Sequence, residues 1–159
     1  MGFFSKMKSK MDAAPTGNPY YRDTMILIYN LTKKDKGMEF DVMCDGLGIK
    51  LVYVKKEDYL QPIGALAGLS CVERTDEVYE GEGFPEVMAV LKNFTSVGMT
   101  DFKERMRRTN GVASHFDLEA ILNTKNMNMN SLELRNMLYE KKTGKKAVDT
   151  AAEEMDSEE

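Results

Sequence analysis

Residues 25–31 read MILIYNL, an apolar run with polar residues on both sides. Such a run is typical of a strand that is buried on both faces of a sheet. A stripe of apolar residues at helical spacing follows, formed by Phe40, Met43, Cys44 and Leu47. Gly48 stands where glycine commonly ends a helix, and residues 49–54, IKLVYV, predict a second strand. The first unit is therefore strand, helix, strand.

The second half of the chain repeats this order. Residues 87–91 (VMAVL) and 118–122 (LEAIL) predict two more strands. Between them, we expect Asp101 to cap a helix with Glu104 as its capping-box partner, and Phe102 and Met106 to face inward. A last helix, capped by Asn130 or Ser131, carries an apolar stripe of Leu134, Met137 and Leu138.

The predicted fold class is α/β, with two βαβ units around a four-stranded sheet plus a C-terminal helix. A crossover between the second and third strands gives a parallel, three-layered sheet, whereas a hairpin-like return gives a ferredoxin-like α+β fold. The continuous apolar strands and the long connection favour the parallel form. We expect a flexible segment at 1–18, one α/β domain at 19–143 and a disordered acidic tail at 144–159.

Length and composition exclude several classes of protein. The 159 residues suffice for one domain, and the net charge of −4 excludes a generally basic nucleic-acid binder. No apolar run approaches the roughly 18 residues that a transmembrane helix needs. With two cysteines and no export signal, the expected compartment is the reducing cytoplasm.

The N-terminal residues form a short amphipathic pattern. On a helix, one face would carry Phe3, Phe4, Met7 and Met11, with lysines opposite. Such a face can touch an anionic membrane surface. The simpler interpretation is an unstructured start before Pro15.

Polar side chains recur where the predicted strands end, and they suggest a site for a neutral or phosphorylated ligand. The carboxyl ends of parallel strands share one edge, where ligands bind. The alternative is local turn and capping chemistry, which uses the same residue types. The candidate ligand-binding residues are Asn30, Gln61, Gly64, Gly68, Asn93, Thr95, Thr124 and Asn126.

The stretch QPIGALAG at 61–68 is the least ordinary part of the chain. On a helix, Gly64 and Gly68 would share one face and admit a second backbone, or their N–H groups would bind an anion. Close packing is the favoured interpretation, because no Walker A or dinucleotide-binding pattern is present. Residues 73–86 hold six acidic groups, which predict a solvated loop, with weak binding of a divalent ion as the alternative.

Catalytic patterns are scarce. His115 is the only histidine, which excludes sites with several histidine ligands, and no cofactor or metal site is implied. Cys44 lies on an apolar stripe and predicts an inert thiol, so Cys71 is the better candidate for a reactive one. The basic residues near 103–108 indicate either a phosphate-bearing partner or i,i+4 pairs with Asp101 and Glu104.

Several of these stretches resemble a bacterial family known only as domain of unknown function 3783. The resemblance covers about residues 25–142, and QPIGALAG together with YEGEGF is its most specific part. It implies a small cytoplasmic α/β domain and supplies no activity, cofactor or catalytic residue. Where the family would have an aromatic residue after its Asn-rich loop, Met127 and Met129 stand in this chain.

The sequence therefore favours a non-catalytic cytoplasmic module that binds a small molecule or a protein, with homo-oligomer formation left open. The alternative is a small thiol-dependent enzyme or redox protein that uses Cys71. Methionines outside the core, such as Met127 and Met129, would suit adaptable binding, although core filling is the simpler account of the 13 methionines.

Overall fold

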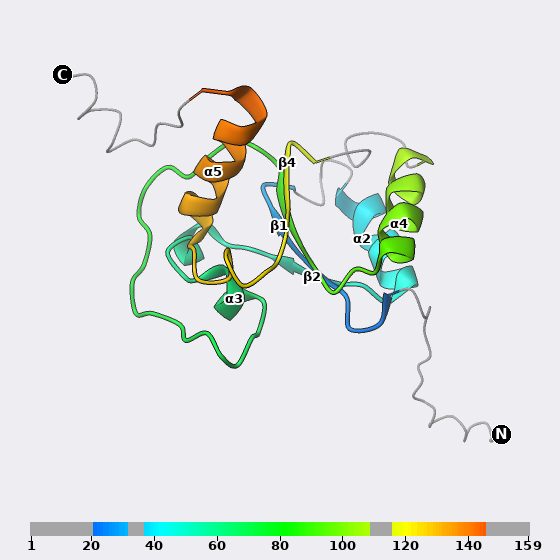
Figure 1. The fold of residues 1–159 in the computed structure, drawn as a ribbon, viewed down its shortest axis with the longest axis horizontal. Helices are drawn as coiled ribbons and strands as arrows, with labels where there is room; N and C mark the ends of the chain where they lie inside the picture. Colours follow the sequence, from blue (N-terminus) through cyan, green and yellow to red (C-terminus); the bar gives the residue numbers. More distant parts are fainter. Residues whose placement is uncertain (1–20, 32–36, 109–115, 146–159) are drawn as a thin grey trace. The chain divides into compact units, whose positions relative to one another are not determined.

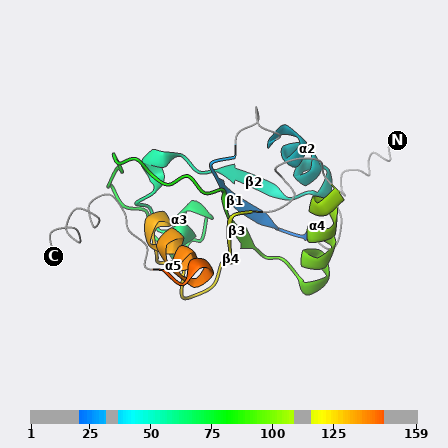
Figure 2. The same ribbon diagram turned by 90° about the horizontal axis from the view of Figure 1, so that it is seen from above.

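The computed structural model describes residues 21–31, 37–108 and 116–145, which form a four-stranded sheet with helices (Figures 1 and 2). This confirms the predicted α/β class and the C-terminal helix. Along the chain the elements are β1 (Met25–Tyr29), α2 (Gly37–Leu47), β2 (Lys50–Tyr53), a 3-10 turn η3 (Lys56–Asp58), α3 (Ile63–Leu66), β3 (Met88–Lys92), α4 (Ser96–Arg108), β4 (Leu118–Ile121) and α5 (Ser131–Thr143).

The strand order in the sheet is β2-β1-β3-β4. β3 and β4 pair in parallel, with Met88 opposite Leu118 and Leu91 opposite Ile121. β1 and β2 also run in the same direction, because the N–H of Lys50 bonds Thr24 and that of Val54 bonds Ile28, four residues further along both strands. Each βαβ unit is therefore internally parallel.

The two βαβ units run in opposite directions, so the sheet is mixed rather than fully parallel. Asn30, just after β1, bonds the backbone just before β3, and Asn93, just after β3, bonds the backbone just before β1. A parallel return requires a long crossover, usually a helix. The hydrogen bonds of Asn30 and Asn93 show that the favoured parallel arrangement is wrong, and the connection between β2 and β3 holds only η3 and the single-turn α3. Whether helices cover both faces of the sheet stays a prediction.

The chain also divides into two compact units, which we call unit 1 and unit 2. They differ from the two βαβ units, because each takes residues from both halves of the chain. Of the described residues, unit 1 comprises 21–25, 37–51 and 93–108, and unit 2 comprises 26–31, 52–92 and 116–145. In unit 1, α2 and α4 meet through Phe40 and Phe102, whose ring centroids lie 6.3 Å apart. In unit 2, the fully buried residues include Tyr29, Ile63 and Leu134.

Capping explains where the last two helices begin. Asn130 caps α5 in a capping box with Glu133, as the sequence predicts. α4 instead begins at Ser96, where the Thr95 hydroxyl accepts a hydrogen bond from the Gly98 N–H at 2.9 Å. The expectation that Asp101 caps this helix is wrong, because Asp101 lies within α4 and accepts a bond from Arg105 one turn later.

Some predictions fall outside the described residues. They concern the amphipathic pattern at 3–11, the role of His115 and the acidic tail beyond residue 145. Within the described ranges, no helix combines the length and the apolar character needed to span a membrane.

Candidate functional site

Asn30 uses its side chain to close the turn after β1. Its φ of 67° lies in the left-handed region, which asparagine tolerates better than most residues. Its side-chain amide donates hydrogen bonds to the carbonyl oxygens of Phe84 and Glu86, each at 2.7 Å. Both donor hydrogens of this amide thus hold the segment that leads into β3.

Asn93 repeats this turn after β3, with a φ of 64°. Its amide donates to the Asp23 carbonyl at 3.1 Å, and the Thr24 hydroxyl donates to the Asn93 carbonyl at 3.2 Å. Because β1 and β3 run in opposite directions, Asn30 and Asn93 lie at opposite ends of this strand pair. The structure therefore does not bring Asn30 and Asn93 to one edge of the sheet. Thr95, which caps α4, lies at the same end of β3 as Asn93.

Gln61 is buried, with 4% of its surface exposed. Its side-chain nitrogen donates to the Thr75 carbonyl at 2.8 Å, and its side-chain oxygen accepts from the Thr75 N–H at 2.9 Å. This pair of bonds ties the beginning of the acidic loop to α3. The side-chain amide of Gln61 therefore has a structural role, because both its nitrogen and its oxygen are bonded to the backbone of Thr75.

Gly64 lies where two backbones approach closely. A Cβ at this position would come within 2.8 Å of the Val72 side chain and 3.0 Å of the Met127 carbonyl oxygen. The N–H groups of Ile63 and Gly64 donate to the carbonyls of Met129 and Met127 at 2.7 and 2.8 Å. These N–H groups are thus engaged by backbone, in agreement with close packing rather than with an anion site.

Gly68 does not share a helical face with Gly64. α3 ends at Leu66, and Gly68 follows with a φ of +82° and with nothing within 4 Å of the place where a Cβ would lie. Its role is to let the chain leave the short helix, since this φ suits glycine.

Asn126 shapes the loop that contacts α3. It is 4% exposed, and its amide donates to the Ile121 carbonyl at 3.0 Å while its oxygen accepts from the Asn123 N–H. Thr124, in the same loop, is exposed. A bridge between Pro62 and Asn130 and a bond from the Ser131 N–H to the Tyr59 carbonyl complete the contact. We call the paired segments 59–64 and 123–131 the α3 junction.

An aromatic cluster next to the α3 junction was not predicted. Tyr59 stacks on Phe84 and on Tyr79, with ring centroids 5.1 and 5.7 Å apart. The hydroxyl of Tyr29 lies 2.6 Å from that of Ser131, and burial raises the pKa of Tyr29 well above its ordinary value. The aromatic residues of YEGEGF, Tyr79 and Phe84, were a signal that could have indicated such a cluster. Their partners, Tyr59 and Tyr29, come from turn and strand positions far away in the chain, so the sequence alone did not pair them.

Arg135 of α5 packs against one side of this aromatic cluster, over the Phe84 ring. Its guanidinium donates to both oxygens of Glu86, at 3.0 and 2.9 Å, and lies over the Tyr139 ring at 4.6 Å. Only 12% of the Arg135 side chain is exposed. The arginine is thus paired as a structural cation and is not presented to an anionic ligand.

The two thiols differ in accessibility. Cys44 is fully buried, and burial, with a smaller contribution from Asp41, raises its pKa to about 12. Its predicted inertness agrees with this environment. Cys71 is exposed. Among the residues described, no three His, Cys, Asp or Glu side chains are grouped so that they could hold a metal ion.

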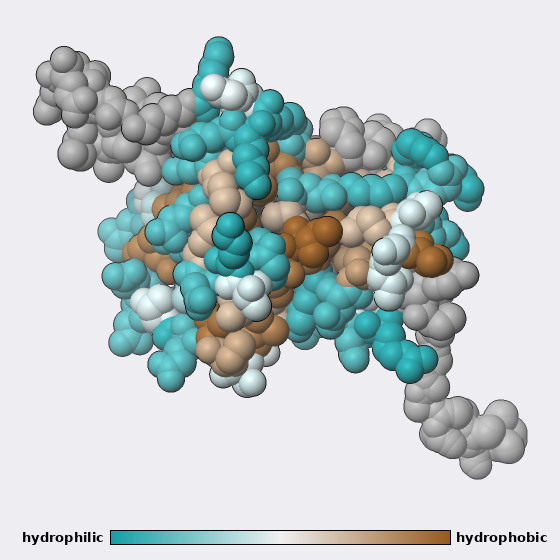
Figure 3. Space-filling view, viewed as in Figure 1, coloured by the Kyte–Doolittle hydropathy of each residue, from teal (hydrophilic) through white to brown (hydrophobic). Residues whose placement is uncertain are grey.

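Four apolar side chains in or next to α3 and the α3 junction are partly exposed. The Leu69 side chain and the backbone carbonyl of Met127 flank Gly64, and Figure 3 shows apolar surface over α3. Ile121, 56% exposed, is bonded to the same loop through the Asn126 amide. The partly exposed residues that we call the α3 surface are Leu66, Leu69, Met127 and Met129.

No protein-family model, curated protein or solved structure matches the chain. Membership of family 3783 therefore stays a prediction, and the case for function depends on the geometry described above.

Proposed function

We propose that this protein is a non-catalytic module that binds a protein partner through the α3 surface. One observation carries the proposal. The polar groups of the α3 junction, including the side chains of Gln61 and Asn126, are used in internal hydrogen bonds. The apolar side chains of the α3 surface, by contrast, are partly exposed.

A small polar ligand is the less favoured partner. Recognition of such a ligand requires a concave site with a few convergent donors and acceptors. The donors predicted for this role contact backbone instead, and Asn30 and Asn93 lie at opposite ends of the central strands. Leucine and methionine side chains suit the apolar anchors of another protein, and methionine adapts to partners of different shape.

The proposal includes the bacterial, cytoplasmic setting that the resemblance to family 3783 implies. A thiol-dependent enzyme or redox protein is the alternative, favoured only by the exposure of Cys71. Both proposals are compatible with homo-oligomer formation, since a second copy of the chain is also a protein partner.

The test is photo-crosslinking of the full chain in the cells that produce it. Benzoylphenylalanine replaces Leu69 on the α3 surface in one variant and Val42 on α2 in the control, because Val42 is 65% exposed. We expect one discrete protein adduct from position 69 that is absent from position 42. A Met127→Glu substitution in the position-69 variant should abolish the adduct. Equal adducts from both positions, or none from position 69, would contradict the proposal.

A further inference from the structure

The end of the α3 surface where α3 begins is acidic. Gln61 lies just before this helix, and its two hydrogen bonds to Thr75 hold the beginning of the acidic loop, residues 73–86, in place there. The N–H of Glu77 donates to the Thr75 hydroxyl at 2.8 Å, which keeps Asp76 and Glu77 in the same turn. Both acidic residues are exposed. Two carboxylates therefore lie close to the first residues of α3.

The end of the surface where α3 finishes is basic. The Lys92 ammonium, at the end of β3, donates to the Ala67 carbonyl at 3.1 Å. Ala67 directly follows the last residue of α3. In Figure 1, the acidic loop and the end of β3 lie on opposite sides of α3. The acidic and basic groups are thus separated along the helix.

Lys125 adds a second cation at the basic end. It lies in the turn after β4, and the amide of the adjacent Asn126 donates to the Ile121 carbonyl at 3.0 Å. Within the sheet, Ile121 pairs with Leu91, the neighbour of Lys92. Both lysines therefore belong to the carboxyl ends of β3 and β4. Lys125 is exposed.

These charges are not neutralised within the part of the chain that the structure describes. None of the ion pairs between described residues involves Asp76, Glu77 or Lys125. Arg74, the one basic residue of the acidic loop, lies 3.6 Å from Asp58 instead. The charges at the two ends of the α3 surface are therefore available to a partner.

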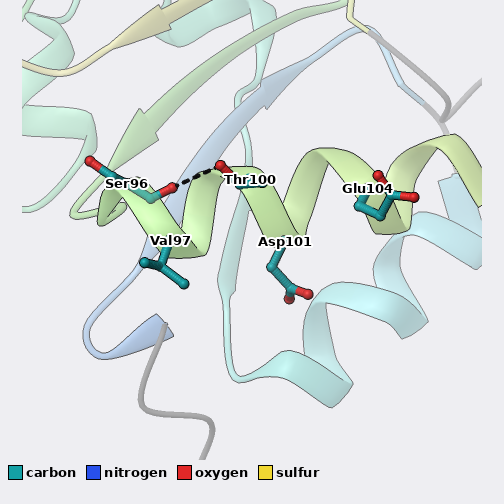
Figure 4. A pocket seen from close by; sticks show the side chains of 5 residues that line it. All are labelled: Ser96, Val97, Thr100, Asp101 and Glu104. Carbon is teal, nitrogen blue, oxygen red and sulfur yellow. Dashed lines mark hydrogen bonds between the residues drawn. The ribbon is translucent and has the colours of Figure 1, made fainter.

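A hollow on α4 lacks such charges. Its two carboxylates, those of Asp101 and Glu104, are both paired with arginines of the same helix. The hollow therefore gives no indication of a charged occupant. Figure 4 shows the residues that line it: Ser96, Val97, Thr100, Asp101 and Glu104.

The α3 surface is complementary to itself. A two-fold axis through its centre would run the α3 helices of two copies antiparallel, so the acidic end of each copy would meet the basic end of the other. The apolar side chains would meet their own counterparts in the middle, as in an isologous interface. Opposite charges would then face each other at both ends of the contact. The four apolar residues are Leu66, Leu69, Met127 and Met129.

We propose that the α3 surface binds a second copy of this chain, with Asp76 and Glu77 of each copy near Lys125 of the other. This inference rests on the proposed function and names its partner. Exposed ion pairs contribute little affinity, so the apolar centre supplies most of the binding and the charges select the partner and its orientation. A patch of this size is small for a permanent dimer, so the pair should dissociate on dilution.

The test is sedimentation velocity of the purified full chain over a hundredfold range of concentration. We expect the mass to rise from monomer to dimer. Lys125→Glu should weaken the dimer at least tenfold, because like charges then meet at both ends of the contact. Asp76→Lys/Glu77→Lys should weaken it similarly. Lys50→Glu, the same charge reversal at an exposed position of unit 1, should leave the dimer unchanged.

Mixing the two charge variants distinguishes a direct contact from a general effect on the fold. In a mixed pair, the Lys125→Glu copy meets the new lysines of the other variant, and the unchanged Lys125 meets the unchanged carboxylates. Opposite charges therefore face each other again at both ends. With one variant labelled by a fluorophore, we expect the mixture to dimerise nearly as strongly as the unmodified chain.

Two results would overturn the inference. One is a chain that stays monomeric at every concentration. The other is a dimer that the charge reversals leave unchanged or that mixing does not restore, which would assign the dimer to another surface. In either case, a photo-crosslinked adduct of the Leu69 variant with a different protein would leave the proposed function standing, and the lack of any such adduct would remove both proposals.

Discussion

The two units differ in the burial of their candidate ligand-binding residues, because only unit 2 has polar side chains among them that are buried. In unit 2, Gln61 and Asn126 are each 4% exposed and make several hydrogen bonds. In unit 1, Asn93 and Thr95 are exposed and each side chain makes one of the bonds described above. Because a buried polar group costs much more when its partner is lost, these residues carry more of the stability in unit 2.

The thiols give the largest expected contrast between the units. At pH 8, Cys71 of unit 2 should react with iodoacetamide about as fast as a free peptide cysteine. Cys44 of unit 1 should react at least a thousandfold more slowly, because a pKa of about 12 leaves little thiolate. Peptide mass spectrometry over time measures both rates. A rate at Cys71 far above that of the peptide would instead favour the thiol-enzyme alternative.

Alanine at two glycines tests the close packing of the α3 junction. Gly64→Ala should destabilise the protein by about 1–3 kcal/mol, because the new methyl group meets the Val72 side chain and the Met127 backbone. Gly46→Ala, on α2 of unit 1, should stabilise it by about 0.5–1 kcal/mol, since nothing lies within 4 Å and alanine favours helix. Urea unfolding measures both, and equal effects would argue against the close approach.

Loss of the Gln61 side-chain amide should be nearly as costly. Gln61→Leu leaves the N–H and carbonyl of Thr75 without their partner, at an expected cost of about 1–3 kcal/mol. The control in unit 1 is Thr95→Ala, which removes an exposed helix cap and should cost about 1 kcal/mol. A neutral effect of Gln61→Leu in urea unfolding would show that the two hydrogen bonds between Gln61 and Thr75 do not stabilise the fold.

The two asparagines with positive φ, one in each unit, should also differ in their contribution to stability. Asn30 donates to two carbonyls and Asn93 to one. Glycine keeps the backbone conformation and removes only the side chain. Asn30→Gly should therefore cost about 1 kcal/mol more than Asn93→Gly in thermal or urea unfolding. The reverse order would show that the Asn93 side chain after β3 contributes more to the free energy of unfolding than the Asn30 side chain after β1.

The smallest effect concerns pH in unit 1. Hydrogen bonds from Arg105 and Tyr21 hold the pKa of Asp101 below its ordinary value. A carboxyl group with a lowered pKa in the folded state adds stability above its unfolded pKa, about 3.9, and loses it as pH falls through the folded pKa. Asp101→Asn should thus flatten the loss of stability below pH 4. Urea midpoints between pH 2.5 and 6 measure the slope, and an unchanged slope would contradict this assignment.

Most individual elements were predictable from the sequence. The strand around residues 25–31, the stripe through Phe40 and Cys44, and the Asn130 cap depend on local patterns that tertiary contacts did not override. The start of α4 was missed because Thr95 competes with Asp101 as a cap, and both residue types suit that position.

The direction of the second βαβ unit and the use of the polar residues were harder to foresee. Strand direction depends on how the chain returns between β2 and β3, and hydrophobic periodicity is the same for either direction. Asparagine at a strand end fits a ligand or a turn equally well. The choice at Asn30 depends on carbonyls more than fifty residues away, which no local pattern specifies.

The buried polar side chains of the α3 junction serve the fold and are closed to ligands. Hydrogen exchange of the Gln61 and Asn126 side-chain amides, followed by NMR on the purified full chain, tests this role most directly. We expect exchange at least tenfold slower than that of exposed side-chain amides in the same protein. Exchange as fast as that of exposed amides would contradict it and return these residues to the list of candidate ligand contacts.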